Sequence, residues 1–469
     1  MHSVTDHLAA LHQAVSVDPS GHVTVRQPDV LRGRVRHLAR ASALGEGAER
    51  AGARWLIWAV AQELGIRPAS IHDLYIARGA GLTPVNFTVP AMNLRALAYD
   101  AARAVFRAAN TRDASAIIFE IARSEIGYTD QRPAEYMASI LAAAIREGYV
   151  GPVFVQGDHF QVNAKKYGDD PDGELGAVVD LIQEAVGAGF YNIDIDTSTL
   201  VDLDLPTLSD QQRLNATLCA QLTHHVRRLE PADITVSVGG EIGEVGGKNS
   251  TEAELRAFMT EYGAALGDTM VGLSKISVQT GTSHGGVVLP DGSLAQVSVD
   301  FDTLRLLSQV SRNAFGLAGA VQHGASTLPE TAFGKFAEAE ACEVHLATNF
   351  QNMLFQRLPA DLHDAMVEWL LAAKSGLRKA GETDDQFLYK NRKFAIGQFK
   401  RQLWDLPPAV LAAVGQAWEE QFGMLFERLA VAGTRALVER HVRAVPVAKS
   451  LDAFSDGEAR DEDVTGLAD

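Results

Sequence analysis

From Val85 onward the chain alternates short apolar runs with longer amphipathic segments. Eight apolar runs can be counted, at residues 85–93, 116–121, 152–159, 191–198, 234–243, 273–281, 316–323 and 342–349. Runs of this length predict strands, and the segments between most of them predict helices, as in the stripe of Val178, Ile182 and Ala185. Repeated strand–helix units are typical of an α/β fold with a parallel sheet. Eight units favour a closed (β/α)8 TIM barrel over an open sheet.

The segments on either side of these runs have a different pattern. Residues 1–80 show helical periodicity, for example at Trp55 and Leu64, interrupted by the turn-prone sequence VDPSGH. We therefore expect a helical N-terminal extension over residues 1–80 and the barrel over 81–358. A C-terminal helical region over 359–448 and an acidic, disordered tail over 449–469 complete the predicted organisation.

Composition adds limits to this fold. A chain of 469 residues is long for one core, but a barrel of about 250 residues with appended helices accounts for it. A net charge of −17 disfavours nucleic acid and anionic membranes as partners. Cys219 and Cys342 are the only cysteines, and no secretory signal or long uncharged apolar stretch is present, so we expect a cytoplasmic protein.

Chemically able side chains gather where the predicted strands end, which is where a TIM barrel has its active site. Three imidazoles come from three different strand ends, and carboxylates accompany them. A single histidine is more often satisfied by a backbone hydrogen bond or exposed, but this joint placement predicts a divalent metal site with a position left open for substrate. The residues are Asp158, His159, Asp194, Asp196, Glu241, His284 and His323.

Six motifs, in order along residues 80 to 352, resemble the class II fructose-bisphosphate aldolases: PAMN, GDH, IDIDTS, GEIGEVGG, TGTSHGG and QHGAS. The resemblance implies a zinc-dependent lyase that reversibly cleaves a phosphorylated ketose, by default fructose 1,6-bisphosphate. The products would be dihydroxyacetone phosphate and an aldehyde, formed through a zinc-stabilised enediolate. It also implies the zinc ligands His159, His284 and His323, the carboxylates Asp196 and Glu241 at an alternative metal position, and Asp158 as the acid/base group.

Substrate contacts are expected at the strand ends and the loops that follow them. Glycine-rich backbone and a helix N-terminus after the seventh and eighth strands can bind a phosphate. Two departures from the family concern these loops, because Ala325 stands where a second glycine is usual and Ala347 stands where the family has asparagine. The predicted substrate-binding residues are Asn93, Gly285, Gly324, Ser326 and Asn349.

The family's proton-abstracting base is a glutamate just past paired glycines, but here Lys248 follows Gly246 and Gly247. Glu244, Glu252 and Glu254 are the nearest candidates. Thr251 and Glu254 have the spacing of a helix capping box, which gives Glu254 a structural role. Glu252 is therefore the predicted base, and Lys248 is an alternative contact to a phosphate.

Other interpretations remain open. The same metal chemistry would serve another ketose phosphate, such as tagatose bisphosphate, and Ala325, Ala347 and Asn349 favour this modestly. A non-catalytic barrel subunit that stabilises a partner is a third possibility, against which the retained histidines and Asp158 argue. We expect zinc, with a second divalent or a monovalent cation as a further option, a small phosphorylated sugar as ligand, and a homo-oligomer that buries the helical extensions.

Overall fold

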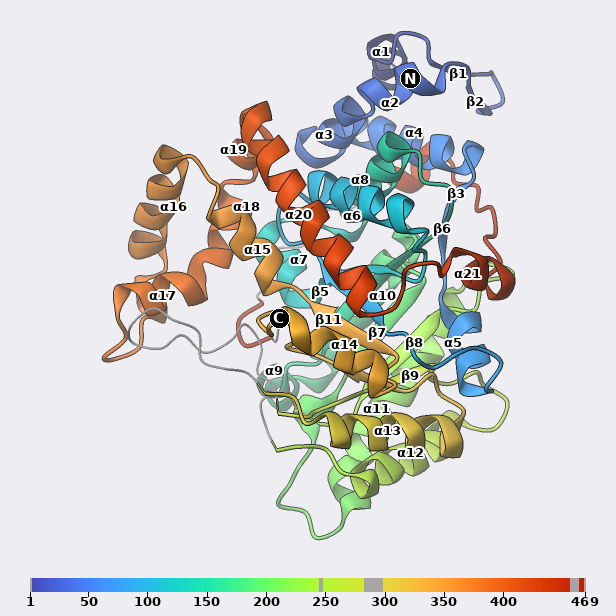
Figure 1. Ribbon diagram of the computed structural model, residues 1–469, viewed down its shortest axis with the longest axis vertical. Coiled ribbons are helices and arrows are strands. Elements are labelled where there is room, and N and C mark those ends of the chain that lie inside the picture. The colour runs from blue at the N-terminus through green and yellow to red at the C-terminus, as the bar shows by residue number, and fades with distance from the viewer. Residues whose placement is uncertain (1, 244–247, 282–297, 456–463, 468–469) are drawn as a thin grey trace.

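The computed structural model describes residues 2–243, 248–281, 298–455 and 464–467 (Figure 1). Parallel strands at its centre each pair with the next along the chain, and β11 pairs with β4, which closes the barrel. The predicted TIM barrel is thus confirmed, and each expected apolar run overlaps one of its strands. These are β4 (Val89–Asn93), β5 (Ile118–Ala122), β6 (Gly151–Gln161), β7 (Asn192–Asp196), β8 (Ser237–Glu241), β9 (Lys275–Val278), β10 (Ala320–Gln322) and β11 (Glu343–Leu346).

Helices follow the barrel strands and cover them. In α10 the side chain of Asp170 accepts the N–H of Gly173, and Gly189, with φ of 109°, follows the last turn. The stripe of Val178, Ile182 and Ala185 is buried, as predicted. The helices are α6 (Ala98–Arg112), α7 (Arg123–Thr129), α8 (Pro133–Glu147), α9 (Ala164–Asp169), α10 (Pro171–Ala188), η1 (Ser198–Leu200), α11 (Leu208–Leu229), α12 (Glu252–Leu266), α13 (Phe301–Phe315), α14 (Glu330–Glu338) and α15 (Thr348–Phe355).

The N-terminal region contains strands as well as the expected helices. Its helices are α1 (His2–Ala10), α2 (Pro28–Arg34), α3 (Arg36–Leu44), α4 (Gly47–Glu63) and α5 (His72–Gly79). A hairpin joins β1 (Val15–Val17) to β2 (Val23–Val25), and its turn forms around Asp18, whose carboxylate accepts the N–H groups of Ser20 and His22.

A further strand, β3 (Ile66–Ala69), pairs with the barrel sheet. It is not among the eight predicted strands. It pairs in parallel with residues 151–154 of β6, whereas β7 pairs with β6 only from Gln156 onward. The eleven-residue β6 therefore has an edge at its start that β3 fills. The side chain of Asn192 on β7 accepts the N–H of Ile71 and so ties β3 to the barrel.

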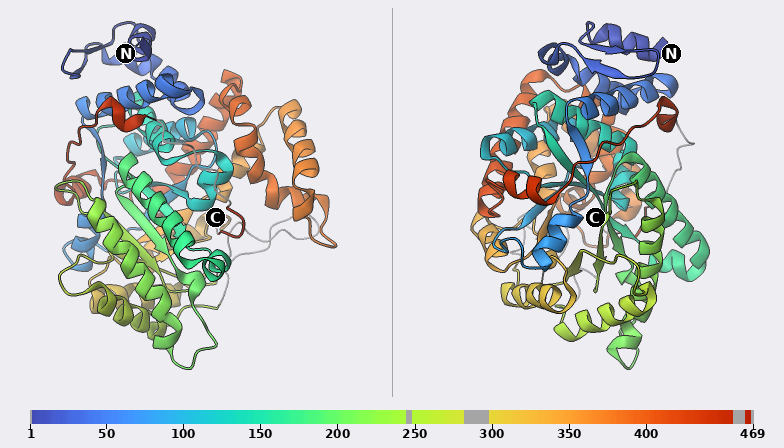
Figure 2. Two further views of the ribbon diagram at one scale, coloured as in Figure 1. Left: turned by 180° about the vertical axis from the view of Figure 1, so that it is seen from behind. Right: turned by 90° about the vertical axis from the view of Figure 1, so that its right-hand side faces the viewer.

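Helices after the barrel pack against its outer face and project from one side (Figures 1 and 2). The longest, α20, lies on α6 and α14. Within the described chain, no helix is both long and apolar enough to cross a membrane. The elements are α16 (Ala360–Ala373), η2 (Ser375–Leu377), α17 (Asp384–Asn391), η3 (Arg392–Phe394), α18 (Ala395–Gln398), α19 (Lys400–Trp404), α20 (Pro408–Arg428), α21 (Arg435–His441) and η4 (Leu451–Phe454).

The described part of the acidic tail packs against the rest of the protein, whereas the sequence composition predicts disorder there. Phe454 is buried, with its ring centroid 6.3 Å from that of Trp58 on α4. Further along, the backbone oxygen of Thr465 accepts a hydrogen bond from the Asn163 side chain. η4 docks through the apolar ring of Phe454. The acidic composition of the surrounding residues gives no indication of this contact. The boundaries between the four predicted regions stay a prediction.

Candidate active site

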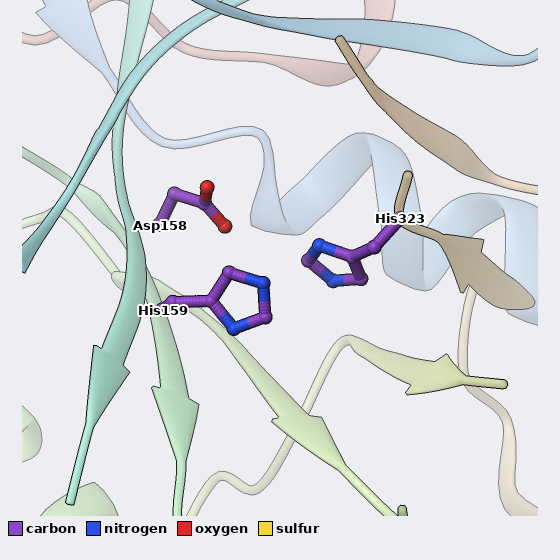
Figure 3. Close-up of side chains that lie close together, drawn as sticks. All are labelled: Asp158, His159 and His323. Atoms are coloured by element: carbon purple, nitrogen blue, oxygen red, sulfur yellow. The ribbon is translucent and has the colours of Figure 1, made fainter. Parts of the chain in front are cut away.

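A bulge in β6 turns two consecutive side chains into the barrel. In a regular strand Asp158 and His159 would point to opposite faces of the sheet. Here residues 157–160 of β6 span the same length as residues 193–195 of β7, so β6 carries one extra residue. His159 has a φ of 38°, in the left-handed region that non-glycine residues rarely adopt. Figure 3 shows the result, with both side chains facing His323.

Imidazoles and carboxylates meet at the carboxyl ends of the strands. His159 Nδ1 lies 3.0 Å from an oxygen of Asp196 and 3.5 Å from an oxygen of Glu241. The ring of His323, which follows β10, has its centroid 4.2 Å from that of His159, and its Nε2 lies 3.0 Å from the Ser277 hydroxyl. All five side chains are buried. Within the described residues, ligand atoms of Asp158, His159 and His323, and those of His159, Asp196 and Glu241, lie within 4.8 Å of one another.

The electrostatics of this cluster suit a cation. Burial alone would lower the pKa of His159, but the carboxylates of Asp158, Asp196 and Glu241 raise it to about 10. Burial and the charge of Asp196 raise the pKa of Glu241 well above its usual value. The cluster thus has an excess of negative charge, and a metal ion that binds His159 displaces a proton. The donor set of imidazoles and carboxylates also matches the ligands of zinc and similar ions.

Hydrogen bonds orient the ligand groups. Asp196, which contacts His159, accepts from the side chains of Gln161 at 2.6 Å and Ser198 at 2.7 Å. Burial opposes the charged form of Asp196, but bonds from His159, Ser198 and Gln161 hold its pKa below the usual value. Partners of this kind fix the ring orientation of a ligating histidine.

The barrel interior beneath this cluster is charged, and of its members only Asp194 is among the residues that the sequence predicts for the site. Apolar side chains usually fill a TIM barrel. Here the Lys275 ammonium donates to Gln156 at 2.7 Å, to Asp194 at 2.9 Å and to Glu343. His345 lies above them, with Nε2 2.7 Å from Glu343. The signal was present in the sequence, because Glu343 and His345 alternate within an apolar strand and therefore face the same side.

These buried charges shift one another's titration. Burial raises the pKa of Glu343, but Lys275 and His345 outweigh it and hold the pKa at about 2. Burial raises the pKa of Asp194 to about 6, with Lys275 opposing. Burial would lower the pKa of His345, but Glu120 and Asp158 raise it well above the usual value. The charges of Glu343 and His345 are therefore stabilised by their neighbours, whereas burial still disfavours the charged form of Asp194.

Comparison with known proteins agrees with this geometry. The family model described as fructose-bisphosphate aldolase class-II matches residues 83–402, which is more than half of the chain. The chain belongs to this family. No curated protein matches it in sequence.

Solved structures are similar to this aldolase-family protein at low sequence identity. A fructose-bisphosphate aldolase from Campylobacter jejuni is 18% identical, with a TM-score of 0.47, over 79% of this chain and 98% of that one. A fructuronate–tagaturonate epimerase from Cohnella laeviribosi is 11% identical, with a TM-score of 0.50, over 90% of each chain. At such identities the likeness concerns the fold alone.

Four of the predicted substrate-binding residues of this aldolase-family protein lie in the described part of the chain. Asn93, predicted to bind substrate, donates from Nδ2 to Asp158 at 3.0 Å and to Glu125 at 2.8 Å, and so lies at the cluster. Gly324 has a φ of 70° directly after His323. Ser326 lies in the loop after β10, and its hydroxyl accepts the N–H of Ala347 at 2.6 Å. Asn349 follows β11 and is half-buried in the first turn of α15.

His284, Gly285, Glu244, Gly246 and Gly247 lie outside the described residues.

The predicted base Glu252 begins α12, and its carboxylate contacts Arg256 of the same helix at 2.7 Å. Among the described residues, no hydrogen bond or ion pair joins Glu252 to the cluster. The capping box of Thr251 and Glu254 is confirmed. Lys248, the alternative phosphate contact, lies 2.8 Å from Glu254.

Proposed function

We propose that this protein is a metal-dependent aldolase that reversibly cleaves a phosphorylated ketose into dihydroxyacetone phosphate and an aldehyde. The observation that carries the proposal is the β6 bulge, which turns Asp158 and His159 together toward His323, Asp196 and Glu241. Fructose 1,6-bisphosphate is the default substrate. Another ketose phosphate, such as tagatose bisphosphate, is the alternative that Ala325 and Ala347 favour.

The residues that would hold zinc are His159, His323 and His284, with Asp196 and Glu241 as the carboxylates of an alternative position. The buried imidazole and carboxylate donors fit such an ion. When bound, it supplies a Lewis acid that stabilises negative charge developing on a ketose oxygen.

Asp158 is proposed to exchange a proton with the substrate. Burial opposes its charge, but His159 and His345 hold the pKa of Asp158 well below its usual value, so it is ionised at neutral pH. As the carbon–carbon bond breaks, the hydroxyl proton on the future aldehyde passes to a carboxylate oxygen of Asp158. In the synthetic direction Asp158 returns that proton to the aldehyde oxygen.

The phosphate is proposed to bind where the loops after β10 and β11 meet. Gly324, Ser326 and the first turn of α15 with Asn349 offer backbone N–H groups and short polar side chains. Glu252 remains the predicted base for the carbon-bound proton. Because its carboxylate pairs with Arg256, this role requires the Glu252 side chain to leave that ion pair.

The test combines metal content with cleavage. We would measure bound metal in purified protein by elemental analysis and assay fructose 1,6-bisphosphate and tagatose 1,6-bisphosphate, with and without a chelator. About one zinc per chain and chelator-sensitive release of dihydroxyacetone phosphate are expected. His323→Ala should lower metal content and activity together, whereas Asp158→Asn should retain metal and lose about 100-fold or more in kcat. Cleavage that survives full metal removal would refute the proposal.

A second candidate is an epimerase acting on an unphosphorylated sugar acid. The observation in its favour is that the fold shared with the Cohnella laeviribosi epimerase extends over 90% of this chain, beyond the family match. Fructuronate and tagaturonate therefore belong in the same assay. Their metal-dependent interconversion without ketose phosphate cleavage would favour this candidate. Bound metal without turnover of any of these sugars would keep the site and move the search to other ketose phosphates, whereas neither bound metal nor turnover would favour the non-catalytic subunit.

A further inference from the structure

His345 lies between two carboxylates inside the barrel. Its Nδ1 is 3.0 Å from Asp158 Oδ1, and its Nε2 is 2.7 Å from Glu343 Oε1. Ionised carboxylates only accept hydrogen bonds, so both ring nitrogens act as donors. The ring is buried, and its centroid lies 4.0 Å from that of His323. His345 therefore links the acid/base candidate to the charged interior of the barrel.

The Asp158 carboxylate is held at both oxygens. Oδ1 lies against His345 Nδ1, and Oδ2 accepts from Asn93 Nδ2 at 3.0 Å. Two donors on opposite oxygens fix the rotation of the carboxylate plane. Each oxygen keeps a second lone pair, which can accept a proton from a substrate hydroxyl. The two donors thus orient Asp158 without using up its capacity as a base.

His345 is held in turn by Glu343, whose own position is fixed by several hydrogen bonds. Glu343 accepts hydrogen bonds from Gln156 at 2.9 Å, from the Tyr75 hydroxyl and from Lys275. These partners come from β6, α5 and β9, which are separate parts of the fold. Because three rigid elements hold Glu343, the position of the imidazole is determined by the barrel and not by the substrate.

Glu120, Glu343 and His345 also have the spacing of a metal site. The contacts argue against that use. A metal needs a free lone pair on the imidazole, whereas both nitrogens of His345 face carboxylates, and the Lys275 ammonium already supplies the positive charge next to Glu343.

We propose that His345 is a positioning residue that holds the Asp158 carboxylate in the orientation for proton exchange, and that Glu343 holds His345. This inference rests on the proposed function only for its effect on turnover. The orientation of Asp158 is a structural statement that can be tested without any substrate.

The kinetic test uses two variants of His345. His345→Met removes both donors and should lower kcat by about 100-fold with KM nearly unchanged, since misplacing a catalytic group by about 1 Å has effects of this size. His345→Gln keeps one amide donor and should recover about tenfold of that loss. Zinc content should equal that of the wild type. His72→Gln, which changes another buried histidine, on α5, is the control and should leave kcat unchanged.

Coupling to Asp158 separates positioning from a general structural effect. In an Asp158→Asn background, His345→Met should reduce kcat by less than about threefold, because the group it positions is already inactive. An equal loss in both backgrounds would overturn the proposal, as would wild-type kcat in His345→Gln. If His345→Met does not fold, the single and double variants with Gln decide the question in the same way.

Crystal structures give the readout that does not depend on activity. In His345→Met or His345→Gln the Asp158 carboxylate should rotate away from its wild-type orientation, while His159 and His323 keep theirs. An unchanged Asp158 would overturn the positioning role. If the wild type cleaves no ketose phosphate, the proposed function fails, but the orientation of Asp158 in these variants still decides this inference.

Discussion

Replacing the buried lysine of the barrel interior should strongly destabilise the protein. Lys275 is 1% exposed, and its ammonium contacts Asp194, Glu343 and the side-chain oxygen of Gln156. Lys275→Met keeps most of the volume and removes the charge. Two carboxylates then remain buried without their main counter-charge, which is more costly than an exposed pair that water can solvate.

The magnitude follows from the carboxylates that Lys275 stabilises. Burial raises the pKa of Glu343, but Lys275 and His345 bring it from 4.5 to about 2. A pKa difference of about 2.5 corresponds to roughly 3 kcal/mol of stability at neutral pH. Because folding lowers this pKa, the contribution is present above pH 4.5 and is lost as the pH falls through 2. Adding the effect on Asp194, we expect Lys275→Met to lose about 3 to 5 kcal/mol at pH 7.5.

The assay is urea unfolding followed by circular dichroism, with free energies of unfolding compared at pH 7.5. The exposed Lys390→Met is the matched control and should change stability by less than about 0.5 kcal/mol. Adding Glu343→Gln to Lys275→Met should recover at least about 1 kcal/mol relative to the sum of the single losses. A loss below about 1 kcal/mol in Lys275→Met, or strict additivity in the double variant, would refute the account.

Three further predictions concern the same interior and the terminal segments. Burial, with a smaller effect of Arg227, lowers the pKa of His72 to about 4, so the free energy of unfolding should fall by about 3 kcal/mol as the pH drops from 6.5 to 4. In urea unfolding, His72→Gln should abolish this pH dependence. An unchanged pH dependence in the variant would contradict the prediction. Tyr75→Phe removes a donor to buried Glu343 and should cost about 1 to 3 kcal/mol, and an unchanged urea midpoint would rule that out. Phe454→Ala should cost about 3 kcal/mol and alter Trp58 fluorescence, whereas wild-type fluorescence and stability would show that η4 is not docked.

The barrel could be predicted from sequence because its signal is repeated and local. Each buried strand is a short apolar run next to an amphipathic helix, and the pairing of neighbours follows from the chain order. β3 lacks this support. Its four residues, IRPA, are too few for a periodic pattern, and what makes them a strand is the exposed start of β6, which exists only in the folded sheet.

The residues of the candidate site could be predicted from sequence, but the orientation of one of them could not. His159, His323, Asp196 and Glu241 could be named because they stand at strand ends, where the fold itself brings them together. The rotation of His159 toward His323 could not, since strict alternation would point it away from Asp158, and only the extra residue in β6 changes that.

Glu343 and His345 were missed for a different reason. Their strand is predicted from its apolar run, but a charged pair inside a barrel departs from the apolar filling that most barrels have. A charge inside an apolar strand is tolerated only when other strands supply its partners, and Lys275, Glu120 and Asp158 do so here. Two alternating charged residues in one buried strand are therefore a reason to search the other strands for counter-charges.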